Sequence, residues 1–256
     1  MESFEGRDLR GRLARGFALG GLCLALGLPV AWIDLAPGGY RLRQCFESDA
    51  ARAERDTQEH ALDRLQLFER ENPSEPAGAI VFCGSSTIER FPLAELFRGK
   101  PCCNRGVANA DSELLEHLLA RCFAGLRPAG IVLYLGGVDV RRPRTDSTAT
   151  HVEAILRALD SAHPGVPKLL LGLLPERHMD AAARERLDLL NTALARLASA
   201  HGSVFLATAR SPLASSSGEL AEEFSVDELH LDRAGYALLA RWIATEGGPV
   251  GRLLAP

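Results

Sequence analysis

The chain of 256 residues is 46% hydrophobic and 24% charged, and its 29 basic and 33 acidic side chains give a net charge of −4. This length and composition suit one large domain with a buried core, and they exclude intrinsic disorder, a collagen-like repeat and a polytopic membrane protein. Because no strong basic field exists, no nucleic-acid partner is expected.

The first feature along the chain is an uncharged stretch from Gly16 to Ile33, preceded by several arginines and followed by Asp34. At about 1.5 Å per residue it would cover roughly 27 Å, close to the thickness of a bilayer core. The arginine bias predicts a cytoplasmic N-terminus over 1–15, a signal anchor or signal peptide over 16–33, and an extracytoplasmic (periplasmic) remainder anchored in the inner membrane. A bacterial protein with a membrane partner follows from this interpretation.

Two other interpretations of this stretch stay open. A cleaved signal peptide also has a charged start and a short apolar run, but no convincing small-x-small cleavage site follows, so the anchor is favoured. A buried helix of a cytoplasmic protein is the third interpretation, because short apolar stretches are ambiguous.

A charged region separates this stretch from the predicted domain. Between Glu47 and Asn72 the apolar residues Leu62, Leu65 and Phe68 recur at helical spacing, which predicts a surface helix. We therefore assign 34–78 to a charged linker helix and 79–256 to the domain.

Within 79–256, apolar runs alternate with helical patterns. Most of the runs are continuously apolar, as expected for parallel strands buried on both faces. The predicted strands are Ala79–Cys83, Cys102–Val107, Gly130–Leu135, Lys168–Leu173 and Ser203–Ala207. The predicted helices run from Asp111 or Ser112 to Gly125, from about Thr145 to Ala162, from the cap Asp180 to Gly202, and from the cap Asp232 to about Thr245. This order predicts an α/β fold, a three-layer α/β/α sandwich with a five-stranded parallel sheet, in which chemistry lies in the loops after the strands.

The loop after the first predicted strand contains Gly84-Ser85-Ser86. A serine at this edge is a candidate nucleophile, provided that a base removes its proton. Glycine and serine are also ordinary turn residues, so this motif alone favours a simple turn.

A second motif, Asp227-Glu228-Leu229-His230, lies just before the last predicted helix. The spacing lets the Asp227 carboxylate orient the His230 imidazole while the other ring nitrogen faces a serine. Taken singly, a solvated loop before a capped helix explains it better, but the two loops together indicate a catalytic arrangement.

With these loops in view, the chain resembles the SGNH, or GDSL-type, hydrolase superfamily, in its bacterial Gly-Ser-Ser branch. The resemblance covers about Ala79 to Ile243 and includes four blocks in the family's order. They are Val81-Phe82-Cys83-Gly84-Ser85-Ser86-Thr87-Ile88, Asn104-Arg105-Gly106-Val107, Leu133-Tyr134-Leu135-Gly136-Gly137-Val138-Asp139, and Asp227-Glu228-Leu229-His230-Leu231-Asp232-Arg233-Ala234-Gly235-Tyr236.

The resemblance implies a flavodoxin-like fold and a serine esterase or acylhydrolase that needs neither cofactor nor metal. It implies Ser86 as the nucleophile, His230 as general base and then acid, and Asp227 as the carboxylate that orients His230. The implied substrates are small-molecule, glycan or lipid esters, with carbohydrate acetyl esters and lysophospholipid-type lipids as candidates.

Two positions depart from the family's pattern. In the family, the oxyanion of the tetrahedral intermediate is bound by the backbone N–H groups of the nucleophile and of a glycine in the second block, and by an asparagine side chain in the third block. Here Asn109 stands at the glycine and Val138 at the asparagine, so the expected oxyanion hole consists of Ser86 and Asn109. Asparagine tolerates left-handed backbone, whereas a valine side chain cannot donate. We also hypothesise that the Asn109 side chain replaces the missing donor.

An enzyme with a reduced oxyanion hole is therefore the leading hypothesis, and a catalytically impaired binding module of the same fold is the alternative. Losing one donor typically costs about 10²- to 10³-fold in turnover, which weakens an enzyme without abolishing its activity.

The cysteines show neither zinc nor redox spacing and are interpreted as small core residues. Arg141, Arg142 and Arg144, just after the third block, are interpreted as a solvated loop rather than part of the site mouth.

Overall fold

The computed structural model describes residues 48–142, 147–207 and 211–256. The predicted segments 1–15 and 16–33 lie outside these residues. Within the part of the chain that is described, no helix is both long and apolar enough to cross a membrane. Contacts divide the chain into two units, Met1–Asp56 and Thr57–Pro256, and the second contains the sheet.

The central feature of the second unit is a five-stranded parallel sheet. Its strands are β1 (Ile80–Gly84), β2 (Cys102–Gly106), β3 (Gly130–Tyr134), β4 (Lys168–Leu171) and β5 (Val204–Leu206), in the order β2-β1-β3-β4-β5. All five predicted strands are confirmed, together with the predicted sandwich. β1 and β3 are buried along their whole length, as expected when helices cover both faces.

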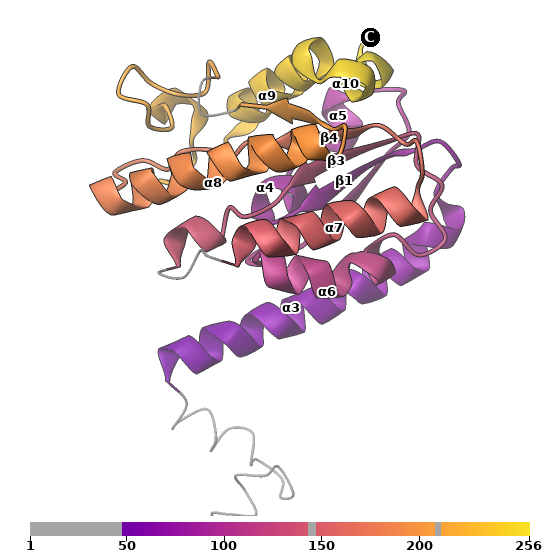
Figure 1. Ribbon diagram of the computed structural model, residues 1–256, viewed down its shortest axis with the longest axis horizontal. Helices are drawn as coiled ribbons and strands as arrows, with labels where there is room; N and C mark the ends of the chain where they lie inside the picture. The colour runs from indigo at the N-terminus through magenta and orange to yellow at the C-terminus, as the bar shows by residue number, and fades with distance from the viewer. Residues whose placement is uncertain (1–47, 143–146, 208–210) are drawn as a thin grey trace, which may run out of the picture. The chain divides into compact units, whose positions relative to one another are not determined.

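Helices cover both faces of the sheet (Figure 1). The helices α6 (Ser112–Cys122), α7 (Thr148–Ala162) and α8 (Ala181–Ala200) form one layer, and α9 (Arg233–Glu246) and α10 (Gly248–Leu254) lie on the opposite face. The single-turn helices α4 (Ser86–Glu89) and α5 (Leu93–Leu96) follow β1. Asp111, Asp180 and Asp232 cap α6, α8 and α9, each accepting a hydrogen bond from a backbone N–H three residues later.

The strand order identifies where a ligand would bind. The chain runs from β1 outward to β2 and then crosses to β3 on the other side of β1. Ligands of open parallel sheets bind beyond the carboxyl ends of the strands at such a reversal. The loops after β1 and β3 therefore enclose the crevice in which a site is expected.

The helix α3 (Asp49–Glu71) supplies part of the core. Its residues Ala61, Leu65 and Phe68 are buried, although the sequence predicts a surface linker that ends before a domain starting at Ala79. The unit that contains the sheet starts instead at Thr57. The difference arises because the apolar stripe of this helix is wide enough to pack against the domain, which charge density alone does not reveal.

A buried arginine fastens the end of α3 to β2. Arg105 is 1% exposed, and its guanidinium donates to the Asn72 side chain at 2.8 and 3.0 Å, to Glu71 at 3.1 Å and to Glu75 at 3.0 Å. A buried charge is tolerated only when it is paired and hydrogen-bonded in this way. These contacts fix the segment after α3 against the sheet.

The end of β2 lies directly against α4, the helix that begins at Ser86. A Cβ atom added to Gly106 would lie 2.2 Å from the Glu89 backbone nitrogen and 2.5 Å from its Cα atom. The Asn104 side chain bridges the same elements, since its Nδ2 donates to the Ile88 carbonyl at 2.6 Å and its Oδ1 accepts from the Gly106 N–H at 2.9 Å. Backbone contact and side-chain bonds together fix the short helix on the sheet.

We expect Gly106→Ala to lower the free energy of unfolding by about 1–3 kcal/mol, because the added methyl group must displace backbone rather than a movable side chain. Urea denaturation monitored by circular dichroism measures this loss. Gly130→Ala is the matched control, because the nearest atom to its new Cβ is the side-chain Cδ1 of Leu253 at 3.2 Å. Equal unfolding midpoints for the two variants would contradict the expectation.

The described cysteines are free. Cys83, Cys103 and Cys122 are buried. Burial raises the pKa of Cys103 and of Cys122 to about 12, which keeps these thiols protonated and unreactive at neutral pH.

Candidate functional site

Ser86 is presented at the carboxyl end of a buried strand. β1 ends at Gly84, Ser85 occupies the N-cap position, and Ser86 is the first residue of α4. Gly84 is required by a close approach, since an added Cβ would lie 2.4 Å from the Tyr134 carbonyl oxygen and 2.8 Å from Ile88 Cγ1. The tight passage from strand to helix leaves the Ser86 residue 9% exposed at the rim of the crevice.

Asp227 and His230 lie together on the loop that precedes α9. The loop is closed by a 3.0 Å hydrogen bond from the Val226 N–H to the His230 carbonyl. One Asp227 oxygen accepts from the backbone N–H groups of Leu229 at 2.8 Å and His230 at 2.6 Å. The carboxylate thus organises its own loop and holds the histidine in place.

The structure brings the three residues predicted for catalysis into one chain of hydrogen bonds. His230 Nδ1 lies 2.8 Å from Oδ2 of Asp227, and His230 Nε2 lies 3.2 Å from the Ser86 Oγ. Because an ionised carboxylate only accepts, the neutral ring carries its proton on Nδ1 and offers Nε2 to the serine hydroxyl. This arrangement can take the proton from a serine that attacks a carbonyl carbon.

Hydrogen bonding keeps Asp227 ionised. Burial acts to raise the pKa of this carboxyl, but the bonds from the His230 ring and from the backbone of His230 and Leu229 outweigh it and hold the pKa at about 2. A carboxylate that stays charged can stabilise the imidazolium that forms when His230 accepts a proton.

We expect the Asp227 carboxyl to titrate at about 2 in the folded protein, against about 3.9 for an unperturbed aspartate. Since folding lowers this pKa, its contribution to stability is complete above about pH 4 and is lost as the pH falls through about 2. An NMR titration of the aspartate carboxyl carbons checks the value, with His230→Ala as the variant in which the pKa should rise. A midpoint near 4 in the unmodified protein would contradict the assignment.

A small hollow opens beside Ser86, with a volume of about 10 Å³. The apolar side chains of Val138, Val140 and Leu174 line part of it, so Val138 and Ser86 border the same hollow. Val138 is 9% exposed and brings no donor to this wall. The hollow is about the size of one water molecule.

Asn109 lies at the edge of the site rather than in this hollow. It is exposed, it does not line the hollow, and it has a φ of 60°. The left-handed backbone agrees with the glycine it replaces in the motif, and asparagine is among the residues that adopt it most readily. The hypothesis that the Asn109 side chain takes over for the missing donor gains no support from this placement.

Two charged residues also reach the hollow, one of which the sequence predicts to lie in a solvated loop and one of which the sequence does not single out. Arg141 and Glu176 both line it, with Nε of Arg141 3.8 Å from Oε1 of Glu176. Arg141 therefore belongs to the site mouth, contrary to the solvated-loop interpretation, whereas Arg142 pairs with Asp111 and Arg144 lies outside the described residues. Burial raises the pKa of Glu176, an effect that Arg141 and His230 partly oppose. Glu176 follows β4, and this position after the carboxyl end of a strand is the feature of the sequence that could have identified it as a site residue.

A buried carboxylate of the third motif block, Asp139, fixes the loop that follows β3. Asp139 accepts from the Ser112 N–H at 3.0 Å, from the Ser112 hydroxyl at 2.7 Å and from the Thr148 hydroxyl at 3.0 Å. It therefore holds the loop after β3 against the starts of α6 and α7. Among the described residues, no group of three histidine, cysteine or carboxylate side chains is arranged to hold a metal ion.

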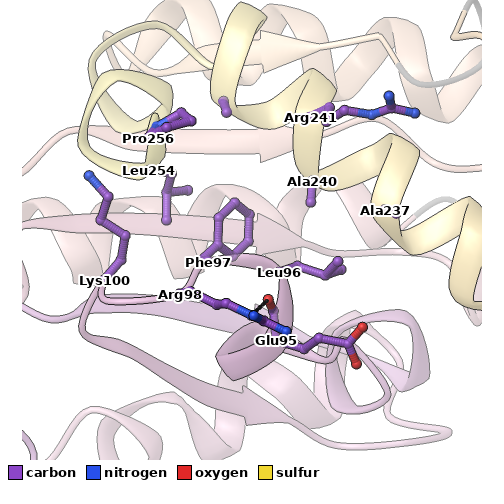
Figure 2. A pocket seen from close by; sticks show the side chains of 11 residues that line it. Glu95, Leu96, Phe97, Arg98, Lys100, Ala237, Ala240, Arg241, Leu254 and Pro256 are labelled. Atoms are coloured by element: carbon purple, nitrogen blue, oxygen red, sulfur yellow. Dashed lines mark hydrogen bonds between the residues drawn. The ribbon is translucent and has the colours of Figure 1, made fainter.

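A larger hollow lies away from the serine (Figure 2). Its volume is about 650 Å³, and it lies between α5, α9 and α10, with Phe97 between Leu254 and Leu96 at its apolar floor. Neither Ser86 nor His230 lines it. The chemistry of the side chains, not the size of a hollow, therefore identifies the candidate site.

Comparison with protein families gives a match over residues 90–238, more than half of the chain, to the model of the GDSL-like lipase/acylhydrolase family. The matched region begins just after the block that contains Ser86 and includes both Asp227 and His230. No curated protein matches the chain.

Solved structures also resemble this chain. A protein from Streptococcus pneumonia, provisionally described as a platelet activating factor, is 27% identical with a TM-score of 0.70, over 77% of this chain and 98% of its own. A GDSL-like lipase from Bacteroides thetaiotaomicron is 19% identical with a TM-score of 0.60, over 68% of this chain and 92% of its own. A variant of an acetyl xylan esterase from Geobacillus stearothermophilus is 16% identical with a TM-score of 0.54, over 67% and 96%. The last two establish likeness of fold alone.

Proposed function

Because the chain belongs to the GDSL-like lipase/acylhydrolase family, we propose that it is a serine hydrolase that cleaves carboxylic esters. The observation that carries the proposal is the hydrogen-bonded chain from the Ser86 Oγ through His230 to Asp227. This geometry supports the roles of nucleophile for Ser86, base for His230 and orienting carboxylate for Asp227.

In the proposed reaction, Ser86 Oγ attacks the ester carbonyl carbon while His230 Nε2 takes the hydroxyl proton. The tetrahedral intermediate collapses as the C–O bond to the alcohol breaks, and His230 gives its proton to the departing oxygen. Water then attacks the acyl-serine with His230 again as base. The bond from the acyl carbon to Ser86 Oγ breaks, His230 returns the proton to Oγ, and the carboxylic acid is released. Throughout, Asp227 orients the ring and stabilises its charged form.

The oxyanion of the intermediate is bound by the backbone N–H groups of Ser86 and Asn109. Neither group donates to an acceptor among the residues that the structure describes. Val138 adds no third donor, so we assign the enzyme a reduced oxyanion hole and a turnover lowered accordingly.

The substrate class we propose is an ester with a short acyl group, such as an acetyl ester of a carbohydrate. The space beside Ser86 is small and partly apolar, which supports a short acyl group. The similarity to an acetyl xylan esterase agrees with this choice. Lysophospholipid-type lipids are the second candidates, consistent with a signal anchor at 16–33 that would hold the domain at the outer face of the inner membrane.

A non-catalytic binding module is the alternative that Val138 favours. A site that lacks one oxyanion donor can still bind an ester. It stabilises the transition state for cleavage less than a site with all three donors does. The same fold and hollow would then serve recognition alone.

The test is reaction of the protein from Ser48 onward with a fluorophosphonate probe and with p-nitrophenyl acetate, beside Ser86→Ala. We expect labelling and acetate release that both disappear in the variant. A folded protein that neither labels nor hydrolyses would overturn the enzymatic proposal and favour the binding module. Comparing acetate with octanoate esters tests the acyl preference.

A further inference from the structure

The side chain that connects the nucleophile helix to the oxyanion turn is Glu89. It is the last residue of α4, three positions after Ser86, and its carboxylate Oε2 accepts a 2.6 Å hydrogen bond from the Ala108 N–H. Ala108 directly precedes Asn109, whose N–H is assigned to the oxyanion. One short, charge-assisted bond therefore fixes the distance between the two backbone groups that must act together.

The turn that Glu89 holds has few other restraints. It is closed by the Ala110 N–H, which donates to the Val107 carbonyl at 3.2 Å, and it contains the left-handed Asn109. Val107 is tied to β1 by a 2.9 Å bond from its N–H to the Gly84 carbonyl. Between these fixed points, the Ala108 N–H is the group through which α4 holds the Val107–Ala108 peptide, one residue before the Asn109 N–H.

Two side chains of α3 lie close to the same carboxylate oxygen. His60 Nε2 lies 2.9 Å and Arg64 Nε lies 3.7 Å from Oε2 of Glu89. Arg64 Nε also donates to the Gly106 carbonyl at 2.9 Å, at the end of β2. The side chain of Glu89 is 20% exposed. A carboxylate contacted by two basic side chains and a backbone donor has little freedom to move.

We propose that Glu89 is a positioning residue of the oxyanion hole, holding the Ala108–Asn109 turn in register with Ser86. The inference rests on the proposed function. It gives α3 an indirect part in catalysis, because its residues hold Glu89 and do not contact the substrate themselves. Because Val138 leaves only two donors, a shift of one of them removes a larger share of the oxyanion binding than in a site with three.

The test compares Glu89→Ala with Glu89→Gln. The amide oxygen of glutamine can still accept from the Ala108 N–H, whereas alanine cannot. We expect Glu89→Ala to lower kcat by about 10- to 100-fold with little change in KM, as displacement of a reacting geometry does. Glu89→Gln is expected to recover most of that loss. Glu116→Ala is the matched control, because Glu116 also contacts a histidine, His151 at 2.7 Å, but on α6 away from the site.

A second variant tests the same bond from its other end. Ala108→Pro removes the donor without altering Glu89, at a turn position where proline is favoured. We expect a loss of kcat similar to that of Glu89→Ala and no further loss when the two are combined, because both remove one interaction. Losses that multiply in the double variant would overturn the proposal.

Amide hydrogen exchange separates this proposal from the proposed function. In the unmodified protein the Ala108 amide should exchange slowly, and in Glu89→Ala it should exchange faster while the thermal midpoint stays close to that of Glu116→Ala. This readout needs no turnover, so it tests the positioning role even if the protein hydrolyses no ester. Unchanged exchange, an alanine variant as active as the unmodified enzyme, or a glutamine variant as slow as alanine would each overturn the inference.

Discussion

Replacing His230 with alanine is expected to lower kcat for p-nitrophenyl acetate by about 10⁴- to 10⁶-fold. The imidazole is the group within reach of the Ser86 hydroxyl, 3.2 Å from its Oγ, and a serine hydroxyl is a weak nucleophile without a base. Steady-state rates measured against the Ser86→Ala background give the size of the loss.

Two controls make this result specific. His117→Ala removes a ring whose hydrogen bond, within the described part of the chain, is to the Glu113 carbonyl of its own helix at 2.7 Å, and it should leave kcat unchanged. Added imidazole should restore part of the activity of His230→Ala, because it can occupy the vacated position. Activity of His230→Ala within tenfold of the unmodified enzyme would refute its role as the base.

Restoring a donor at the third block is expected to have the next largest effect. We predict that Val138→Asn raises kcat by at least about tenfold, with about 10²- to 10³-fold as the full value of one oxyanion donor. Val138 lines the same hollow as Ser86, and its φ of −72° and ψ of −33° suit asparagine equally well. The comparison of kcat values for the acetate ester measures the gain.

The variant Val138→Ala tests whether a gain in kcat comes from the added hydrogen-bond donor or from a larger hollow. Alanine enlarges the hollow without adding a hydrogen bond, so it should broaden acyl preference while leaving kcat for acetate nearly unchanged. If alanine and asparagine accelerate acetate hydrolysis equally, steric relief explains the gain and the oxyanion argument fails. A slower Val138→Asn enzyme that is stably folded would likewise contradict the assignment.

Much of the fold could be predicted because buried parallel strands have a simple signature. A continuous apolar run such as Gly130–Leu135 can be recognised without knowing its neighbours, and aspartate caps mark where several helices begin. By contrast, α4 and α5 are single turns that are too short for a periodic pattern. α10 begins with Gly248 and Pro249, residues typical of loops, and it is stabilised by packing on β3 and β4.

The residues of the candidate site likewise fall into those that the sequence predicts and those that only the fold reveals. Ser86, Asp227 and His230 could be named because their motifs place them in order along the chain. Glu89 and Glu176 could not, and Arg141 is assigned to a solvated loop, because their importance depends on what lies across from them. Nothing in the sequence relates Glu89 to Ala108, which the fold brings within hydrogen-bonding distance. The span of α3 that joins the core is assigned to a linker because the sequence shows its apolar stripe but not the surface on which that stripe packs.

The contact between Ser86 and His230 joins positions 144 residues apart. During synthesis the serine leaves the ribosome early and its base arrives only with the last segment of the chain. Under the proposed mechanism, a nascent or C-terminally truncated chain carries an inert serine, and hydrolysis begins only when the loop that holds His230 has reached Ser86. Ester turnover would for this reason report completed folding, and the specific activity of a sample would measure the fraction of molecules in which both ends of the domain have met.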